Sequence, residues 1–545
     1  MVKSRAVSLP STNLFPPAAA SLSGRAEGER HRRRRAALGW GRALAFALLV
    51  GVAAALPKFA AALSALAVFA VLAVWAIRKP VNAFLIALAV YPFYPMVRGY
   101  IRVARLPIPL EPAGMWPELV LAVMFLSVVV RCCKSGERLR LTWLDAPMVV
   151  LVLGSVYGVV LALAQRQIVA SVYGIHYSLT AMLFYFAARW AKASERDLRR
   201  VLTAFVGSFV LLALPSLFDY AFRTNFSVRI ASELRPAISG QWEPDVFWRV
   251  YPRMQSLLFD ENLWGALCAN VAFLTLAALV APLPHPRGRP RTAVRAAVPL
   301  FFLATGCLIL SLSRGALACY IVGFATILLL ASRHRGRVVA LGLSLIVAGG
   351  MALFLLSSHP RVAGAIDRFA SIGDKSSTVA YDRVEMWVSA IEAFKIMPSG
   401  VGLGTAGHAA VHHGGGAVVT DGQYFKVLVE QGVPGIVTWL VGFVGVVALT
   451  VRLLRGAEGV DRIVGLTAAA SLCGQLAQNV GSNASDFYYV PVLTWGLLGF
   501  FFARRTTPAP PEAGGGMPIR TALTALTAER PAALPAPAVA EGALL

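Results

Sequence analysis

The sequence predicts an all-α fold, a polytopic integral membrane protein with about 14 transmembrane helices and a long loop that carries short helices. Of its 545 residues, 57% are hydrophobic and only 14% are charged. The apolar residues gather in runs of about 16 to 22 residues, long enough to cross a bilayer as helices. Each run must be helical because the bilayer core offers the backbone no hydrogen-bond partner, and the alternating pattern of a membrane β-barrel is not visible.

The apolar runs also divide the chain. Residues 1–42, which include the run "RHRRRR", are expected to be a disordered basic tail, 43–221 an N-terminal set of helices, 222–503 a second region with a long loop at 358–432, and 504–545 a second disordered tail. The candidate helices lie at about 43–57, 59–77, 81–97, 116–130, 145–164, 172–189, 201–221, 260–281, 296–312, 315–332, 338–357, 433–451, 463–480 and 488–503.

The charges of the short loops give an orientation. With the amino terminus inside, the loops on the cytoplasmic side hold 21 Lys and Arg, against 11 in the opposite loops. The segment 358–432 is left out of this count, because the charge rule applies only to short loops. Both tails are therefore expected in the cytoplasm. The long segments at about 222–258 and 358–432 are expected on the outer face.

The net charge of +24 does not indicate nucleic-acid binding, because the basic residues are spread over many loops. That spread favours membrane orientation and contact with lipid headgroups. Of the six cysteines, Cys132 and Cys133 lie in a basic loop. The other four lie in apolar runs, where a thiol behaves as a small hydrophobic group, and no spacing indicates a disulfide or a zinc site.

Four polar patches fall on the expected outer face: "YPRMQSLLFDENLWG", with Asn262 at the mouth of a helix, "LSLSRGALACY", the stretch 365–407, and "VTDGQYFKVLVEQGVPG". Arg314 in the second patch interrupts an apolar hairpin. A guanidinium in that position is costly, so it usually faces a cavity or a partner. Alternatively, with Ser313 and Gly315 beside it, Arg314 marks a tight turn.

Arg253, Arg368 and Arg383 are expected at the same level as Arg314. Several guanidinium groups with few compensating carboxylates suit an anion, because the planar fork binds phosphate oxygens in pairs and stays charged. A pyrophosphate is the expected ligand.

The loop 358–432 contains three further features. Residues 381–394 have the spacing of a short amphipathic helix. The glycine-rich run "MPSGVGLGTAG" that follows either brings backbone amides to a substrate or only reverses the chain. His408, His412 and His413 lack an Asp, Glu or Cys at close spacing, so a flexible loop is favoured over a metal site.

The stretch from Val419 to Gly435 packs polar groups just before an apolar run. Asp421 is a candidate for orienting or deprotonating a hydroxyl, and Gln423, Tyr424 and Lys426 are candidates for contacts with sugar or phosphate. The alternative is a helix start, with Thr420 or Asp421 as its cap and Tyr424 in the core. The two interpretations are compatible.

In this order, "FDENLWG", "LSLSRGALACY", "DRVEMWVSAIEAFKIMPSGVGLGT" and "DGQYFKVLVEQGVPGIVTW" resemble the bacterial O-antigen ligase and polysaccharide polymerase superfamily, over about residues 245–500. The resemblance implies that residues 222–503 form the catalytic region, with Arg253, Arg314 and Arg383 at the family's arginine positions. Ligases commonly have a His-Asn pair where this chain has Asp421 and Gly422. This departure is more similar to the exopolysaccharide polymerase branch, and His412 or His413 is an alternative replacement.

The resemblance further implies a membrane glycosyltransferase, either polymerase or ligase, of the bacterial inner membrane. It would use an undecaprenyl-pyrophosphate-linked glycan as donor and a glycan hydroxyl as acceptor at the periplasmic face, without a metal or nucleotide cofactor. Membrane lipids and components of polysaccharide export are the other expected partners, and nucleic acid is not. The rival hypotheses are a secondary transporter, which needs paired halves with broken helices, and a flippase for lipid-linked glycans, which needs a deep charged cavity.

Overall fold

The computed structural model describes residues 70–95, 116–222, 260–281, 290–331, 378–407, 420–483 and 489–506, with short pieces at 254, 256–258, 336, 339–340, 342–344, 409–410 and 486. Within these residues the chain is helical and has no β-strand, which confirms the all-α class. The main helices are α3 (Pro80–Val90), α6 (Trp116–Ser135), α7 (Ala146–Ala164), α8 (Ile168–Gly174), α9 (Thr180–Trp190), α10 (Glu195–Phe222), α13 (Glu261–Val280), α14 (Pro290–Leu310), α15 (Arg314–Leu330), α18 (Thr378–Ile396), α20 (Gln423–Leu454), α21 (Gly459–Gln478) and α22 (Tyr489–Thr506).

Six helical stretches of the described residues are long and apolar enough to cross a membrane: Trp116–Ser135, Trp143–Ala164, Ile168–Trp190, Glu195–Phe222, Glu261–Val280 and Gln423–Leu454. Shorter apolar helices cover Pro80–Phe93, Ala296–Leu310 and Arg314–Leu330. The chain is therefore a membrane protein with transmembrane helices. The predicted helix at 43–57 lies outside the described residues, those at 59–77 and 338–357 lie only partly within them, and the total of 14 stays a prediction.

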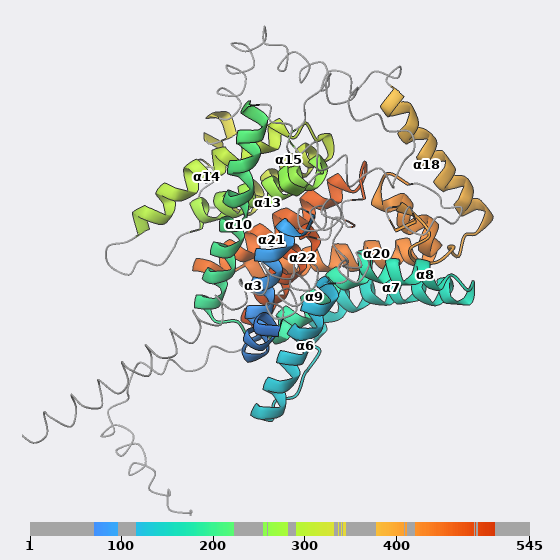
Figure 1. Ribbon diagram of the computed structural model, residues 1–545, viewed down its shortest axis with the longest axis horizontal. Coiled ribbons are helices and arrows are strands. Elements are labelled where there is room, and N and C mark those ends of the chain that lie inside the picture. The colour runs from blue at the N-terminus through green and yellow to red at the C-terminus, as the bar shows by residue number, and fades with distance from the viewer. Residues whose placement is uncertain are drawn as a thin grey trace, which may run out of the picture.

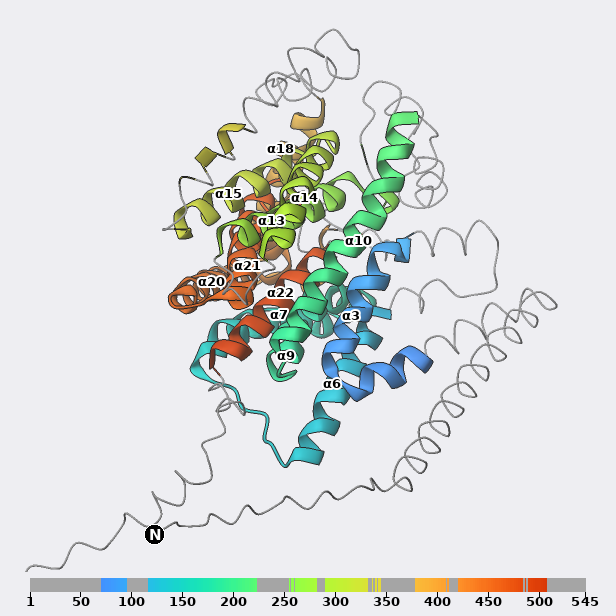
Figure 2. The ribbon, with the colours of Figure 1, turned by 90° about the vertical axis from the view of Figure 1, so that its left-hand side faces the viewer.

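The two C-terminal helices α21 and α22 lie between two groups of helices (Figure 1). On one side are α13, α14 and α15, and on the other are α3, α6 and α9, an arrangement that the turned view repeats (Figure 2). Helix α21 packs on α13 and α15, α22 packs on α9, and α20 packs on α7. The C-terminal helices therefore join the two halves of the chain into one bundle.

Small residues allow the helices to approach closely. A side chain at Gly474 on α21 would meet the main chain of Cys319 on α15, and one at Gly496 on α22 would meet the ring of Phe84 on α3. Interfaces of this kind are typical of membrane helices, whose association depends on close packing, because lipid tails are as apolar as the helices themselves.

One end of the bundle carries most of the described ion pairs, and we call it the basic end. Lys79 pairs with Asp197 at 2.7 Å, and Lys192 pairs with Glu137 at 2.6 Å. Arg504 pairs with Asp461 and donates to the main chain of Ala193. The loops that these pairs join are the ones that the charge count predicts to lie on a common side.

Candidate functional site

Three helices begin and one helix ends at the opposite end of the bundle, in a region that we call the junction. Helix α13 begins after Asp260, whose carboxylate accepts hydrogen bonds from the backbone of Asn262 and Leu263, both at 2.8 Å. Helix α15 begins after Ser313, whose hydroxyl caps the helix and donates to Oδ1 of Asn262 at 2.7 Å. The two helix starts are therefore in contact, and each contributes a predicted site residue.

Arg314 is the first residue of α15 and is partly buried. The next residue, Gly315, faces the end of α21, since a β-carbon there would lie 3.4 Å from Cγ of Gln478 and 3.6 Å from the hydroxyl of Ser482. Arg314 and Asn262 thus lie close to the carboxyl end of α21. The hairpin of "LSLSRG" is a tight turn as well, because Leu312 has a φ of 51°.

Helix α20 begins against the same end of α21. The backbone N–H of Gly422 donates to Oδ1 of Asn483 at 3.1 Å, and that of Gln423 donates to the carbonyl of Asn479 at 2.8 Å. Gly422 has a φ of 133°, and a β-carbon there would lie 2.8 Å from the carbonyl of Val480. Only glycine fits this turn without strain. Gly422 is also the N-cap residue, so the expectation that Thr420 or Asp421 caps the helix is wrong.

Asp421 is partly exposed, and its backbone carbonyl accepts a hydrogen bond from Nε1 of Trp387 on α18. The ring of Trp387 stacks on Phe425 with centroids 5.3 Å apart, so α18 packs on the start of α20. This confirms the short helix predicted from the spacing of 381–394. Arg383 lies on α18 about one turn before Trp387, and its side chain lies outside the described residues.

The other polar residues of this stretch are held by the protein. The hydroxyl of Tyr424 donates to the carbonyl of Leu476 at 2.8 Å, and its ring packs edge-on against Trp439. Lys426 is fully buried, and its ammonium group contacts Asp486 at 2.5 Å and Ser178 at 3.4 Å. Its burial favours a role in holding the junction together over the predicted direct contact with sugar or phosphate.

The glycine-rich turn reverses the chain, and several of its amides are bonded within the protein. The backbone N–H groups of Val401 and Gly402 donate to carbonyls of α20, and that of Leu403 donates to Gly158 on α7 at 2.8 Å. The amides of Gly404 and Ala406 donate to the buried carboxylate of Glu430 at 2.9 and 3.2 Å. Because these amides are occupied, the alternative in which they cradle a substrate is wrong for this part of the turn.

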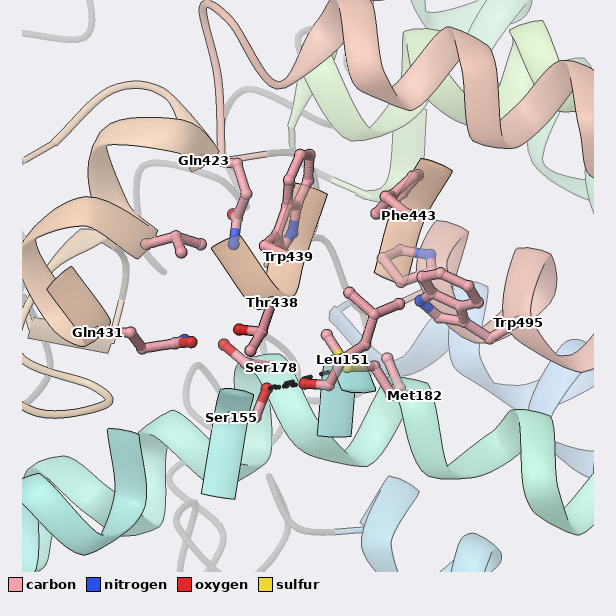
Figure 3. Close-up of a pocket in the computed structure, with 13 residues that line it drawn as sticks. Leu151, Ser155, Ser178, Met182, Gln423, Gln431, Thr438, Trp439, Phe443 and Trp495 are labelled. Carbon is pink, nitrogen blue, oxygen red and sulfur yellow. Dashed lines mark hydrogen bonds between the residues drawn. The ribbon is translucent and has the colours of Figure 1, made fainter. Parts of the chain in front are cut away.

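A small pocket lies below the start of α20 (Figure 3). The amide groups of Gln423 and Gln431 turn toward the hydroxyls of Ser178 and Thr438, and aromatic rings, including Trp439, line the other half. The lining therefore contains uncharged hydrogen-bonding groups and ring faces. Its polar half is contributed by both halves of the chain, since Ser178 belongs to the π-helical turn Ile175–Leu179 before α9.

Several buried polar atoms at the junction have no hydrogen-bond partner among the described residues. Gln478 and Asn479 are fully buried, and neither atom of either side-chain amide is bonded. Oε1 of Gln423 and Oδ2 of Asp486 are also buried and have no hydrogen-bond partner among the described residues. Such groups cost about 1 to 3 kcal/mol each, so native proteins rarely gather them without a functional reason.

The sequence interpretation did not select Asp486, Gln478 or Asn479. Asp486 carries a usable signal, because an isolated carboxylate between two apolar helices needs a buried cation. The two amides carry no such signal, since glutamine and asparagine near a helix end are usually solvated.

Some predicted residues lie outside the described residues: Arg253, Arg368 and the histidines at 408, 412 and 413. Among the side chains that the structure does describe, no group of three or more His, Cys, Asp or Glu gathers as a metal site would.

Residues 299–440 match the family model described as O-antigen ligase. The resemblance to the O-antigen ligase and polymerase superfamily is confirmed. The O-antigen ligase match contains Arg314, the glycine-rich turn and the start of α20, and it lies outside the segments that supply Asn262 and Asp486. No curated protein matches the chain.

Proposed function

We propose that the protein is a membrane glycosyltransferase, acting as polymerase or ligase in surface or exopolysaccharide synthesis. It would transfer a glycan from an undecaprenyl-pyrophosphate carrier to a hydroxyl of an acceptor glycan, without a metal. The site would face the periplasm of the bacterial inner membrane, with both termini in the cytoplasm. The placement of the basic loops supports this orientation, because positive residues concentrate on cytoplasmic loops.

The observation that carries the proposal is the convergence of Asn262, Arg314 and the start of α20 on the end of α21. Three helix amino termini meet there, and such termini favour negative charge. Arg314 adds a fixed positive charge at the same place. The convergence supports a donor side built around Arg314 and an acceptor side built around Asp421.

The chemistry follows from these parts. The acceptor hydroxyl oxygen forms a bond to the anomeric carbon, the bond from that carbon to the pyrophosphate oxygen breaks, and the hydroxyl proton passes to Asp421. The leaving diphosphate gains negative charge, which Arg314, with Arg253 and Arg383, would stabilise. Preorganised charges of this kind are typically worth about 10²- to 10³-fold in rate, and general-base help about 10²- to 10⁴-fold.

The buried groups would position these parts. The Lys426–Asp486 pair ties the start of α20 to the segment after α21, and Glu430 ties α20 to the glycine-rich turn. Gln423, which lines the pocket and has an unbonded Oε1, would supply a hydrogen-bonding group for a sugar hydroxyl. Arg368 and Asn262 remain candidates for substrate contacts. Substrate positioning of this kind lowers the barrier without chemical participation.

The alternative is a flippase for lipid-linked oligosaccharides, or another secondary transporter. Such a protein needs the same recognition of pyrophosphate, but it also needs a deep charged cavity between its halves. The described pocket is lined by uncharged side chains, which favours transfer over transport.

The deciding experiment incubates the purified protein in nanodiscs with an undecaprenyl-pyrophosphate-linked repeat unit extracted from the source membranes, without nucleotide and with a chelator. A ladder of glycan products is expected on a gel. The Arg314→Ala variant should lose at least about 10²-fold in rate while inserting normally. Arg199→Ala, at an exposed pair with Glu195 on the basic end, is the matched control and should keep full activity.

Bound repeat unit without a ladder would favour the flippase. Normal product from Arg314→Ala would remove Arg314 from the site.

A further inference from the structure

Helix α18 carries an apolar surface that the protein covers only in part. Its buried side includes Ala390 and Trp387, which pack toward α20. Helical spacing places Val384, Val388 and Ile391 in a neighbouring strip, and these side chains are 50%, 51% and 39% exposed. We call these three residues the α18 strip.

A second face of α18, about 100° around the helix from the strip, is polar, and Glu385, Ser389 and Glu392 are exposed there. Helical spacing puts the stem of Lys395 beside the strip, and its ammonium group turns to Glu392 on the polar face, at 2.7 Å. A helix with one apolar face, one charged face and a Trp or Lys near the boundary is typical of the membrane–water interface.

The end of α18 lies at a depth where other helices expose apolar side chains. The carbonyl of Ser399, just after α18, accepts a hydrogen bond from the hydroxyl of Tyr157 on α7 at 2.9 Å. Tyr157 lies seven residues before the end of α7, which is about 10 Å along the helix axis. Beyond Tyr157, α7 still exposes Val160 and Leu163 at 57% and 49%. The chain after α18 is therefore level with a lipid-facing part of α7.

The apolar surface of α18 is also continuous with that of α20. The backbone N–H of Val433 donates to the carbonyl of Pro398 at 3.0 Å, so the end of α18 meets the apolar part of α20. Ile396 and Met397 are 81% and 38% exposed there, beside Val433 and Val437 at 50% and 52%. Because Val437 lies on a transmembrane helix, this surface leads directly into the lipid-facing side of the bundle.

We propose that the α18 strip is embedded in the acyl chains of the adjacent lipid leaflet, so that α18 is an interfacial helix. The exposed apolar side chains are then covered by lipid, and the charged face remains in water. This arrangement holds the helix that carries Arg383 at the level of the lipid headgroups. It depends only on the protein being in a membrane, so it stands or falls separately from the proposed glycosyltransferase activity.

The test uses the full chain in nanodiscs, with Cys132, Cys133 and Cys473 replaced by Ser. Val388→Cys carries an environment-sensitive NBD label, and Ser389→Cys, about 100° around the helix, is the matched control. Nitroxide-labelled phosphatidylcholine should quench the label at 388 at least about twofold more than the label at 389. Aqueous iodide should show the opposite preference.

Equal quenching of both labels by iodide, with no effect of the lipid nitroxide, would overturn the proposal. Protection of 388 from both quenchers, together with a doubled particle mass, would also overturn it, because a second copy would then cover the strip. Labels at Val384→Cys and Ile391→Cys probe the same strip if the variant at 388 does not fold, and they should give the same lipid preference.

Discussion

The two ends of the bundle use charge in different ways. At the basic end the pair Lys192–Glu137 is exposed, with side chains that are 49% and 41% exposed. At the junction the pair Lys426–Asp486 is fully buried. Exposed pairs gain little because water screens them, whereas a buried charge depends entirely on its partner. The exposed pair is therefore suited to orientation in the membrane, and the buried pair to a fixed arrangement of groups.

The largest effect is expected from breaking the buried pair. Asp486→Asn takes from the buried Lys426 ammonium the carboxylate that it contacts and should destabilise the protein by about 3 to 5 kcal/mol. Lys426→Met should cost more than Asp486→Asn, because it leaves two carboxylates, Asp486 and Glu430, without their cation. Thermal unfolding of the purified protein measures both.

The double variant Lys426→Met/Asp486→Asn is the control, and it should recover part of the loss of Lys426→Met, because only Glu430 is then left without its cation. If the double variant loses the sum of the two single effects, the pair is not coupled, and the contrast between the two ends fails.

A smaller effect is expected from the glycines of the two ends. Gly404 has a φ of 88°, and a β-carbon there would lie 1.9 Å from the carbonyl of Ala170 on α8. Gly136, at the basic end, has a φ of 67° but nothing within 4 Å of that position. Gly404→Ala should therefore pay for both a clash and backbone strain, about 2 to 4 kcal/mol, and Gly136→Ala for strain alone, about 1 kcal/mol. Equal shifts in unfolding temperature would show that the turn can move away from α8.

The sequence predicts the helices, and which face the polar patches share, better than it predicts the contacts between helices. The helix predicted at 145–164 is observed at Ala146–Ala164, because a long apolar run has only one solution in a bilayer. The polar patches around Arg314 and Asp421 were expected on one face, and both helix starts do meet α21. Successive membrane helices place every second loop on the same side, and this rule is enough to predict that the two patches share a face.

The partners across the junction were not predictable in the same way. The contact of the glycine-rich turn with Gly158, and of Lys426 with Ser178, joins residues more than 200 positions apart. Such contacts depend on how helices pack, which hydropathy does not encode. The apolar run predicts a membrane helix only from 433, and the helix start near 421 is the alternative interpretation of the polar stretch; the observed helix begins at Gln423. The backbone at Gly432 is non-helical, with a φ of 61°, and separates the polar first turns from the apolar remainder.

The smallest effect is expected at the basic end. The hydrogen bond from Lys192 lowers the pKa of the Glu137 carboxyl from its ordinary value. A lowered pKa stabilises the folded state at pH values above the unfolded pKa, near 4.3, and this contribution is lost as pH falls through the folded value.

Because both side chains are about half exposed, Lys192→Ala should change the free energy of unfolding by less than about 0.5 kcal/mol at pH 7. The difference from the parent protein should shrink further in 1 M salt, where the Debye length falls to about 3 Å. A loss at pH 7 as large as that of Asp486→Asn would mean that exposure does not separate the two ion pairs, and the comparison would lose its physical basis.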